Sequence, residues 1–166
     1  MAAHRLTDLP RRFGEGLVRD LRGLRGNERL AVGAVALIVI SFPLPWYSVS
    51  GSDLVRTGLG SFSFAEGAIL LTCAAVVFLA LQVGGGYVPP RPLTEWGLFV
   101  AAGIWIALIV GYLMLDRPEL NLDLPLARIE THYGLGYGIF VALAGAVLLI
   151  VVGLRARSEH RRRRPT

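Results

Sequence analysis

The sequence contains no lysine, a single cysteine and few charged residues of any kind. All 17 basic residues are arginines, and charged residues make up 17% of the 166-residue chain, whereas 54% are hydrophobic. With Cys73 alone, an internal disulfide framework and a cysteine-based metal site are excluded. A soluble domain needs more polar surface than this, and the mean hydropathy of +0.56 agrees. The composition therefore predicts an integral membrane protein.

Motifs of enzyme chemistry are missing as well. The sequence has no HExxH, no GxSxG and no glycine-rich phosphate loop. The three histidines, His4, His132 and His160, lack the spacing of a shared metal site. We therefore expect no enzyme activity, no metal and no cofactor. The alternative, an active site on the outer side of the membrane, would have to use loop charges, namely Asp53, Arg56, Asp116, Arg117, Glu119, Asp123, Arg128, Glu130 and His132.

Four apolar stretches are long enough to cross a bilayer core of about 30 Å, which takes roughly 20 helical residues. They cover residues 30–47, 64–83, 96–115 and 137–154. Pro43 and Pro45 interrupt the first stretch, so we expect its regular helix to end near Phe42 and its last residues to be kinked or extended. The predicted fold is an all-α membrane protein whose residues 30–154 form a bundle of four transmembrane helices.

The arginines fall mainly on one side of such a bundle. An even number of spans puts both termini and the connector 84–95 on the same side, which then carries fourteen arginines, against three on the other. Arginine-rich loops stay in the cytoplasm, so we expect a multi-pass plasma-membrane protein with both termini cytoplasmic. A competing interpretation treats the first span as a cleaved signal peptide, processed near Ser48 to Ser50, which leaves three spans in the same orientation.

Residues 1–29 form a basic arm with helical periodicity. Its apolar residues share one helical face and are Leu6, Leu9, Phe13, Leu17, Leu21 and Leu24. The arginines opposite them are Arg11, Arg12, Arg19 and Arg22. The pattern predicts an amphipathic helix lying on anionic lipids of the inner leaflet. A mobile arm and docking against a soluble partner are the alternatives.

The last segment, residues 155–166, is an arginine-rich tail without apolar periodicity, and we expect it to be disordered. Attraction to anionic lipid is favoured over nucleic-acid binding, because neither an aromatic platform nor a folded nucleic-acid reader accompanies the basic run.

Polar and aromatic residues mark the expected ends of the spans. Ser63 and Glu66 match a capping box, which we favour over an ion-binding role for Glu66. Thr94 and Glu95 fit the start of the third span in the same way. Aromatic side chains are typical of the membrane interface, and the candidates are Trp46 and Tyr47 on the outer side, with Tyr87 and Trp96 on the inner side.

Small residues recur at four-residue spacing within two spans. Because small residues let transmembrane helices approach closely, we expect these positions to be helix contacts, either within the chain or with a neighbour. They are Gly103, Ala107 and Gly111 in the third span, and Gly134, Gly138, Ala142 and Ala146 in the fourth.

The outer connectors show the alternation of extended segments. Leucine alternates with polar residues over 119–126, and Tyr47 and Val49 alternate with Ser48 and Ser50. The two segments are predicted either to pair into a small outer sheet or to rest their leucines on the membrane surface. Pro125 would make its strand an edge strand.

The order of these features resembles small four-helix membrane proteins of actinobacteria. The resemblance rests on the first helix ending in Pro43-Leu44-Pro45-Trp46-Tyr47-Ser48, on Ser61-Phe62-Ser63-Phe64-Ala65 entering the second helix, and on the arginine-rich tail. It implies the same architecture, and it brings no catalytic residues, because members of this kind are functionally uncharacterised.

Together these patterns predict a non-enzymatic membrane protein that acts through association with itself or with another membrane component. The small-residue faces and the missing core charges carry that prediction. The alternative is a subunit of a transporter or channel for an apolar or lipid-like solute, which needs no ionisable groups along its path.

Overall fold

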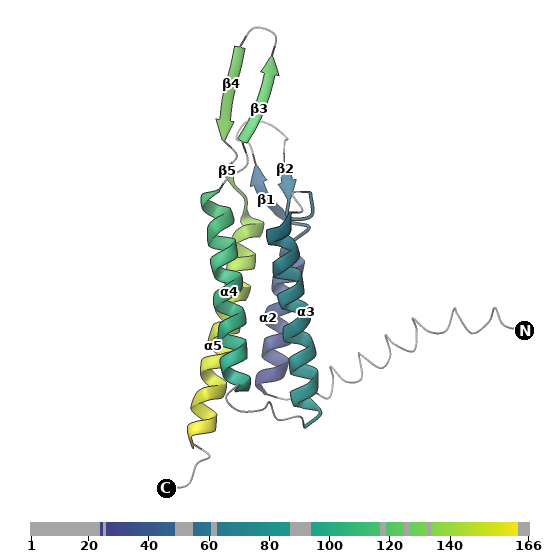
Figure 1. The fold of residues 1–166 in the computed structure, drawn as a ribbon, viewed down its shortest axis with the longest axis vertical. Helices are drawn as coiled ribbons and strands as arrows, with labels where there is room; N and C mark the ends of the chain where they lie inside the picture. The colour runs from purple at the N-terminus through teal and green to yellow at the C-terminus, as the bar shows by residue number, and fades with distance from the viewer. Residues whose placement is uncertain are drawn as a thin grey trace, which may run out of the picture.

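The structure is a computed structural model of the chain, and it describes Leu24 and residues 26–48, 55–60, 63–86, 94–116, 119–124, 127–132 and 134–162. Four long helices run side by side, with short strands gathered beyond one end (Figure 1). The helices are α2 (Asn27–Ser41), α3 (Phe64–Gly84), α4 (Glu95–Leu115) and α5 (Tyr137–Arg162). Most of the predicted amphipathic arm, including Leu6, Leu9, Phe13, Leu17 and Leu21, lies outside the described residues, and so does Tyr87.

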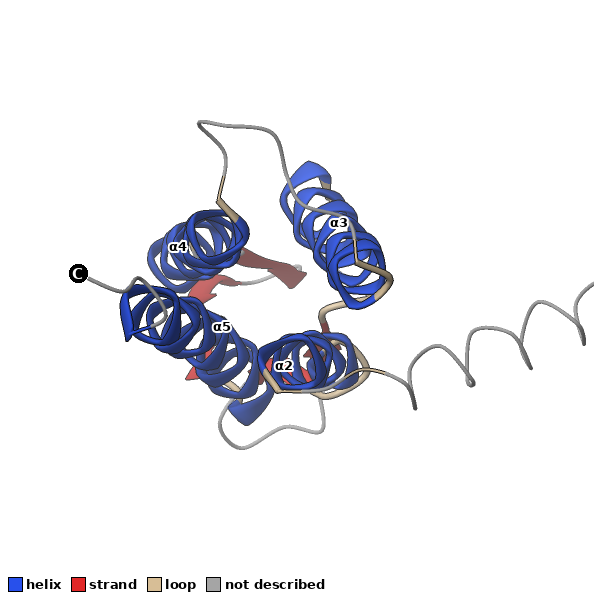
Figure 2. Ribbon diagram, turned by 90° about the horizontal axis from the view of Figure 1, so that it is seen from below, coloured by secondary structure: helices blue, strands red, loops and turns tan. Residues whose placement is uncertain are grey.

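The four helices form a ring when viewed along their axes (Figure 2). α5 packs against both α4 and α2, whereas α3 lies beside α2 and touches α4 less extensively. We call the end of the bundle that carries the strands the strand end. The opposite end, where α2 begins and α5 ends, is called the terminal end (Figure 1).

Three helices are long and apolar enough to cross a membrane: α3, α4 and the segment Tyr137–His160 of α5. Their starts agree with the predicted stretches to within one residue. α2 has only 15 residues, which corresponds to about 22 Å of helix and falls short of a bilayer core. Its end at Ser41, with Phe42 as the C-cap, confirms the boundary expected from the prolines.

Five strands follow from the connectors, so the fold is not purely helical. β1 (Pro45–Ser48) lies between β2 (Val55–Thr57) and β5 (Gly134–Leu135) in an antiparallel sheet, while β3 (Glu119–Leu124) and β4 (Ala127–His132) form a separate hairpin. The extended connectors were expected, but their predicted pairing with each other is wrong. The segment 119–124 pairs with 127–132 across a two-residue connection, because a local hairpin closes a much shorter loop than a pairing with residues near 47.

The tail also differs from its prediction. We expected disorder from Arg155, but α5 continues to Arg162. Arg155 and Glu159 form an ion pair one helical turn apart, and Ala156 between them is 9% exposed. Local helix-stabilising pairs and packing at the terminal end thus extend the helix beyond its apolar stretch.

The polarity of the bundle is typical of a protein surrounded by lipid. Its centre is filled by fully buried apolar side chains, including Ile38, Ile69, Phe99, Ile106, Ile139 and Leu149. The outward faces of the helices are apolar as well, with large exposed residues such as Leu71, Phe78, Trp105, Leu108, Phe140 and Val151. A water-soluble bundle would place polar residues on those faces. The helical faces therefore support the membrane assignment independently of helix length.

Candidate association surfaces

Glycines on α4 and α5 bring these two helices into close contact. A Cβ atom added to Gly103 would lie 2.9 Å from the carbonyl oxygen of Ala146, and one added to Gly153 would lie 2.8 Å from that of Trp96. Real Cβ atoms almost never come so near a backbone oxygen, so neither position tolerates a side chain without a shift of a helix. The two glycines lie toward opposite ends of the α4–α5 seam and set its spacing.

A second seam joins α5 to α2. A Cβ atom added to Gly145 would lie 3.1 Å from the carbonyl oxygen of Ala34, and Ala142 and Ala146 on the same helix are fully buried. Sequence reasoning missed Gly145 and Gly153, because the four-residue ladder was assigned to a single face. α5 packs against two neighbours and therefore presents small residues on two faces.

The predicted small-residue ladders are only partly helix contacts. Gly103, Ala142 and Ala146 are buried in the seams of this one chain, and Ala107 packs partly buried against the core. Gly111 has no described atom within 4 Å of its Cβ position. Gly134 does not belong to a helical ladder, because it lies in β5 beside the carbonyl oxygen of Ser48.

Trp46 closes the strand end of the bundle. It is fully buried, and its indole Nε1 donates a hydrogen bond of 2.8 Å to the carbonyl oxygen of Ser41. Gly58 and Gly138 flank the ring so closely that an added Cβ atom would lie 2.9 Å and 2.7 Å from ring carbons, respectively. The tilted ring of Phe42 stacks at a centroid distance of 5.2 Å.

Tyr47 joins the same closure from the next position of β1. It is 2% exposed, and its hydroxyl donates a 2.8 Å hydrogen bond to the carbonyl oxygen of Leu113 near the end of α4. The prediction that Trp46 and Tyr47 face the membrane interface is therefore wrong. Both rings turn inward because β1 crosses over the bundle end, where they satisfy carbonyl groups of α2 and α4 that the helices leave without partners.

The remaining interface residues lie nearer the terminal end. Trp96 is partly buried, and the guanidinium of Arg157 lies 4.9 Å from the centroid of its ring. Leu24 is 5% exposed and packs against α3 at Gly84. A tryptophan paired with an arginine one helix away is typical of the boundary between hydrocarbon and headgroups.

The helix caps follow the sequence closely. The Ser63 hydroxyl accepts a hydrogen bond from the backbone of Ala65, and the Glu66 carboxylate accepts one of 2.8 Å from the backbone N–H of Ser63 and another from its hydroxyl. This confirms the capping box. Thr94 caps α4 by accepting from the backbone of Gly97, and Glu95 occupies the first turn of that helix.

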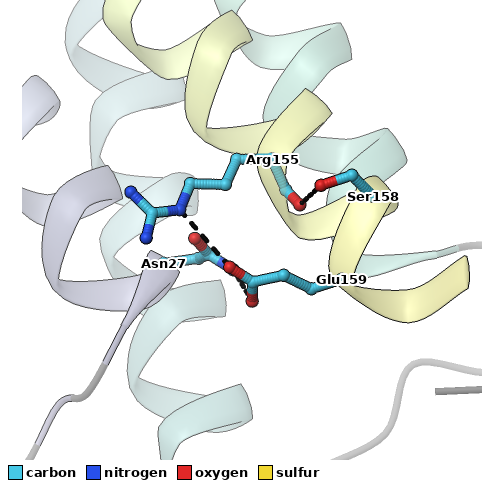
Figure 3. Close-up of polar contacts among 4 residues, drawn as sticks. All are labelled: Asn27, Arg155, Ser158 and Glu159. Carbon is cyan, nitrogen blue, oxygen red and sulfur yellow. Dashed lines mark hydrogen bonds and ion pairs between the residues drawn. The ribbon is translucent and has the colours of Figure 1, made fainter. Parts of the chain in front are cut away.

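A polar cluster ties α2 to α5 at the terminal end (Figure 3). The Glu159 carboxylate accepts a 3.0 Å hydrogen bond from the side-chain amide of Asn27 and a 3.3 Å one from Nε of Arg155. Asn27 is 9% exposed at the first turn of α2, so its amide needs this partner. Ser158 donates to the carbonyl oxygen of Arg155 and completes the cluster.

An apolar groove of about 420 Å³ runs between α2 and α3 and opens to the side of the bundle. Its lining contains no charged residue and comes from Val35, Val39, Leu70, Cys73, Ala74, Val77, Phe78 and Leu81. Phe78 is 65% exposed and Val39 is 43% exposed, so the rim of the groove is itself apolar. This rim faces the medium that surrounds the helices.

No protein-family model matches the chain, and no curated protein matches it. The resemblance to small four-helix membrane proteins of actinobacteria therefore stays a prediction. Within the described parts of the chain, no group of three or more histidine, cysteine, aspartate or glutamate side chains is placed to hold a metal ion. The features that could act on another molecule are thus apolar surfaces rather than a constellation of reactive groups.

Proposed function

We propose that the protein is a non-enzymatic, multi-pass protein of the plasma membrane that acts by associating with another transmembrane helix, from a second copy or from a different membrane protein. The groove between α2 and α3 is the observation that carries this proposal. The glycine seams are already filled by helices of the same chain, whereas the groove presents an unfilled apolar surface at the side of the bundle.

The proposal includes four crossings with both termini in the cytoplasm. α2 is short, but β1 continues it to Ser48, and the backbone of β1 is hydrogen-bonded to β2 and β5. Non-helical backbone is tolerated at membrane depth where protein satisfies its polar groups, so α2 and β1 together complete one crossing. The terminal end then faces the cytoplasm, as the arginine count of the sequence predicts.

A photo-crosslinking residue at Ala74 tests the association directly. Ala74 is an exposed position in the groove, and its neighbour Ala75 is exposed on α3 but does not line the groove. In native membranes, we expect a crosslinker at position 74 to yield a discrete polypeptide adduct, measured by gel shift and mass spectrometry, and one at position 75 to yield little.

The matched substitutions Ala74→Leu and Ala75→Leu complete the experiment. Leucine at position 74 fills the groove and should reduce the adduct formed by a crosslinker at the rim residue Phe78, whereas leucine at position 75 should not. Equal adduct yields at positions 74 and 75, or only lipid adducts at both, would contradict association through the groove.

The same groove supports a second candidate, a transporter or channel subunit for an apolar or lipid-like solute. Its lining has no ionisable group, and such a solute requires none. Lipid adducts at position 74 alone, together with flux of an apolar tracer in reconstituted vesicles that Ala74→Leu reduces, would favour this function over association.

A further inference from the structure

Leu24 is seated on a glycine at the terminal end of α3. Only 5% of this leucine is exposed, and its Cδ2 would lie 2.6 Å from a Cβ atom placed on Gly84. A side chain on residue 84 would therefore collide with Leu24. The seat holds the chain that precedes α2 against α3, the neighbouring helix.

The chain turns sharply between this seat and α2. Gly26 has φ +65°, in the left-handed region that glycine adopts without steric cost, so the segment before it does not continue the axis of α2. Asn27, the next residue, is bonded to Glu159 of α5. Residues 24–27 are thus held by α3 on one side and by α5 on the other, and residues 1–23 must leave from a fixed point beside the end of α3.

We infer that residues 1–23 lie on the lipid surface at the terminal end, with the apolar stripe that ends in Leu24 immersed among the lipids. α3 is one of the helices able to span the membrane, so its last residue, Gly84, marks the depth of the bilayer boundary. Leu17 and Leu21 share the helical face of Leu24, and that face meets the bundle where hydrocarbon begins.

The charges of the arm favour anionic lipid over neutral lipid. Residues 1–23 carry five arginines against three carboxylates, and Arg11, Arg19 and Arg22 lie opposite the apolar stripe. The excess is small, so anionic headgroups strengthen binding to a modest degree and the apolar stripe supplies most of it. The inference rests on α3 crossing a membrane, and it does not depend on the proposed association through the groove.

Depth measurements on paired positions test the inference. In the full chain with Cys73→Ala, single cysteines at Leu17→Cys or Arg19→Cys are labelled with an environment-sensitive fluorophore and reconstituted into vesicles of phosphatidylcholine and phosphatidylglycerol. Lipids brominated on the acyl chains should quench the label at position 17 several-fold more than the label at position 19. Equal quenching at the two positions, or none at either, would overturn the inference and leave a soluble partner or a mobile arm.

Two further comparisons separate the seat from general effects on folding. Gly84→Leu should diminish quenching at position 17, because it expels Leu24, while Gly111→Leu should leave it unchanged, because no described atom lies near that Cβ position. Leu24→Gln should act like Gly84→Leu without adding bulk to α3. In vesicles of phosphatidylcholine alone, quenching at position 17 should fall moderately, and an unchanged value would refute the role of anionic lipid.

Discussion

Single residues at the strand end carry much of the packing that distinguishes this bundle from four loosely associated helices. Gly138 shows this best, because an added Cβ atom would lie 2.8 Å from the carbonyl oxygen of Pro45 as well as 2.7 Å from the indole of Trp46. The first turn of α5 therefore contacts the backbone of β1 directly. Its role is internal to the chain, although the sequence ladder allowed contact with a neighbouring chain instead.

Leucine at Gly138 should destabilise the protein strongly. The new side chain must displace the backbone of β1 or the buried ring of Trp46, at a cost of about 3 kcal/mol. Thermal or denaturant unfolding in detergent micelles, followed by tryptophan fluorescence, measures the loss. Gly111→Leu is the matched control on α4 and should change stability by less than about 0.5 kcal/mol. Similar losses in both variants would refute the assigned packing.

Some of these residue roles can be read from the sequence, and others cannot. The Ser63–Glu66 capping box is local, with both partners within one helical turn, so its spacing alone predicted the observed hydrogen bonds. The burial of Trp46 and Tyr47 depends on where β1 passes relative to α4 and α5, which are distant in sequence. Amphipathic aromatic residues suit either an interface or a polar contact inside the bundle, and only the tertiary arrangement decides.

At the scale of elements, helix boundaries follow from local chemistry and helix partners do not. Pro43 and Pro45 end α2, and apolar length determines α4, but the continuation of α5 to Arg162 depends on the Arg155–Glu159 pair and on burial of Ala156. Likewise, the strand alternation of residues 119–124 was visible in the sequence, while its partner was assigned incorrectly.

The start of α3 offers a test of an element boundary. Ser63→Ala removes the hydroxyl that accepts from Ala65 and donates to Glu66, and it should destabilise the protein by about 1 kcal/mol. In a double-mutant cycle with Glu66→Ala, the two losses should add to more than the loss in the double variant, because the residues act as one cap. Strict additivity, measured by unfolding in micelles, would contradict the reciprocal box.

At the scale of the whole molecule, apolar surface inside and outside the helix ring defines the protein. Buried residues such as Phe99 fill the centre, while Leu108 and Phe78 project outward from neighbouring helices. Composition predicted this arrangement in general, because the charged residues are too few to cover a soluble bundle. The groove between α2 and α3 could not be predicted, since it depends on how closely two particular helices pack.

The sidedness of the chain tests the account most directly. Single cysteines in a Cys73→Ala background, placed near residue 160, in the 87–93 connector, in the 49–54 connector and near the start of the chain, are exposed to a membrane-impermeant thiol reagent in intact cells and in lysed cells. Four crossings predict labelling in intact cells only in the 49–54 connector. Labelling of just one terminus in intact cells would put the two ends on opposite faces and contradict the account.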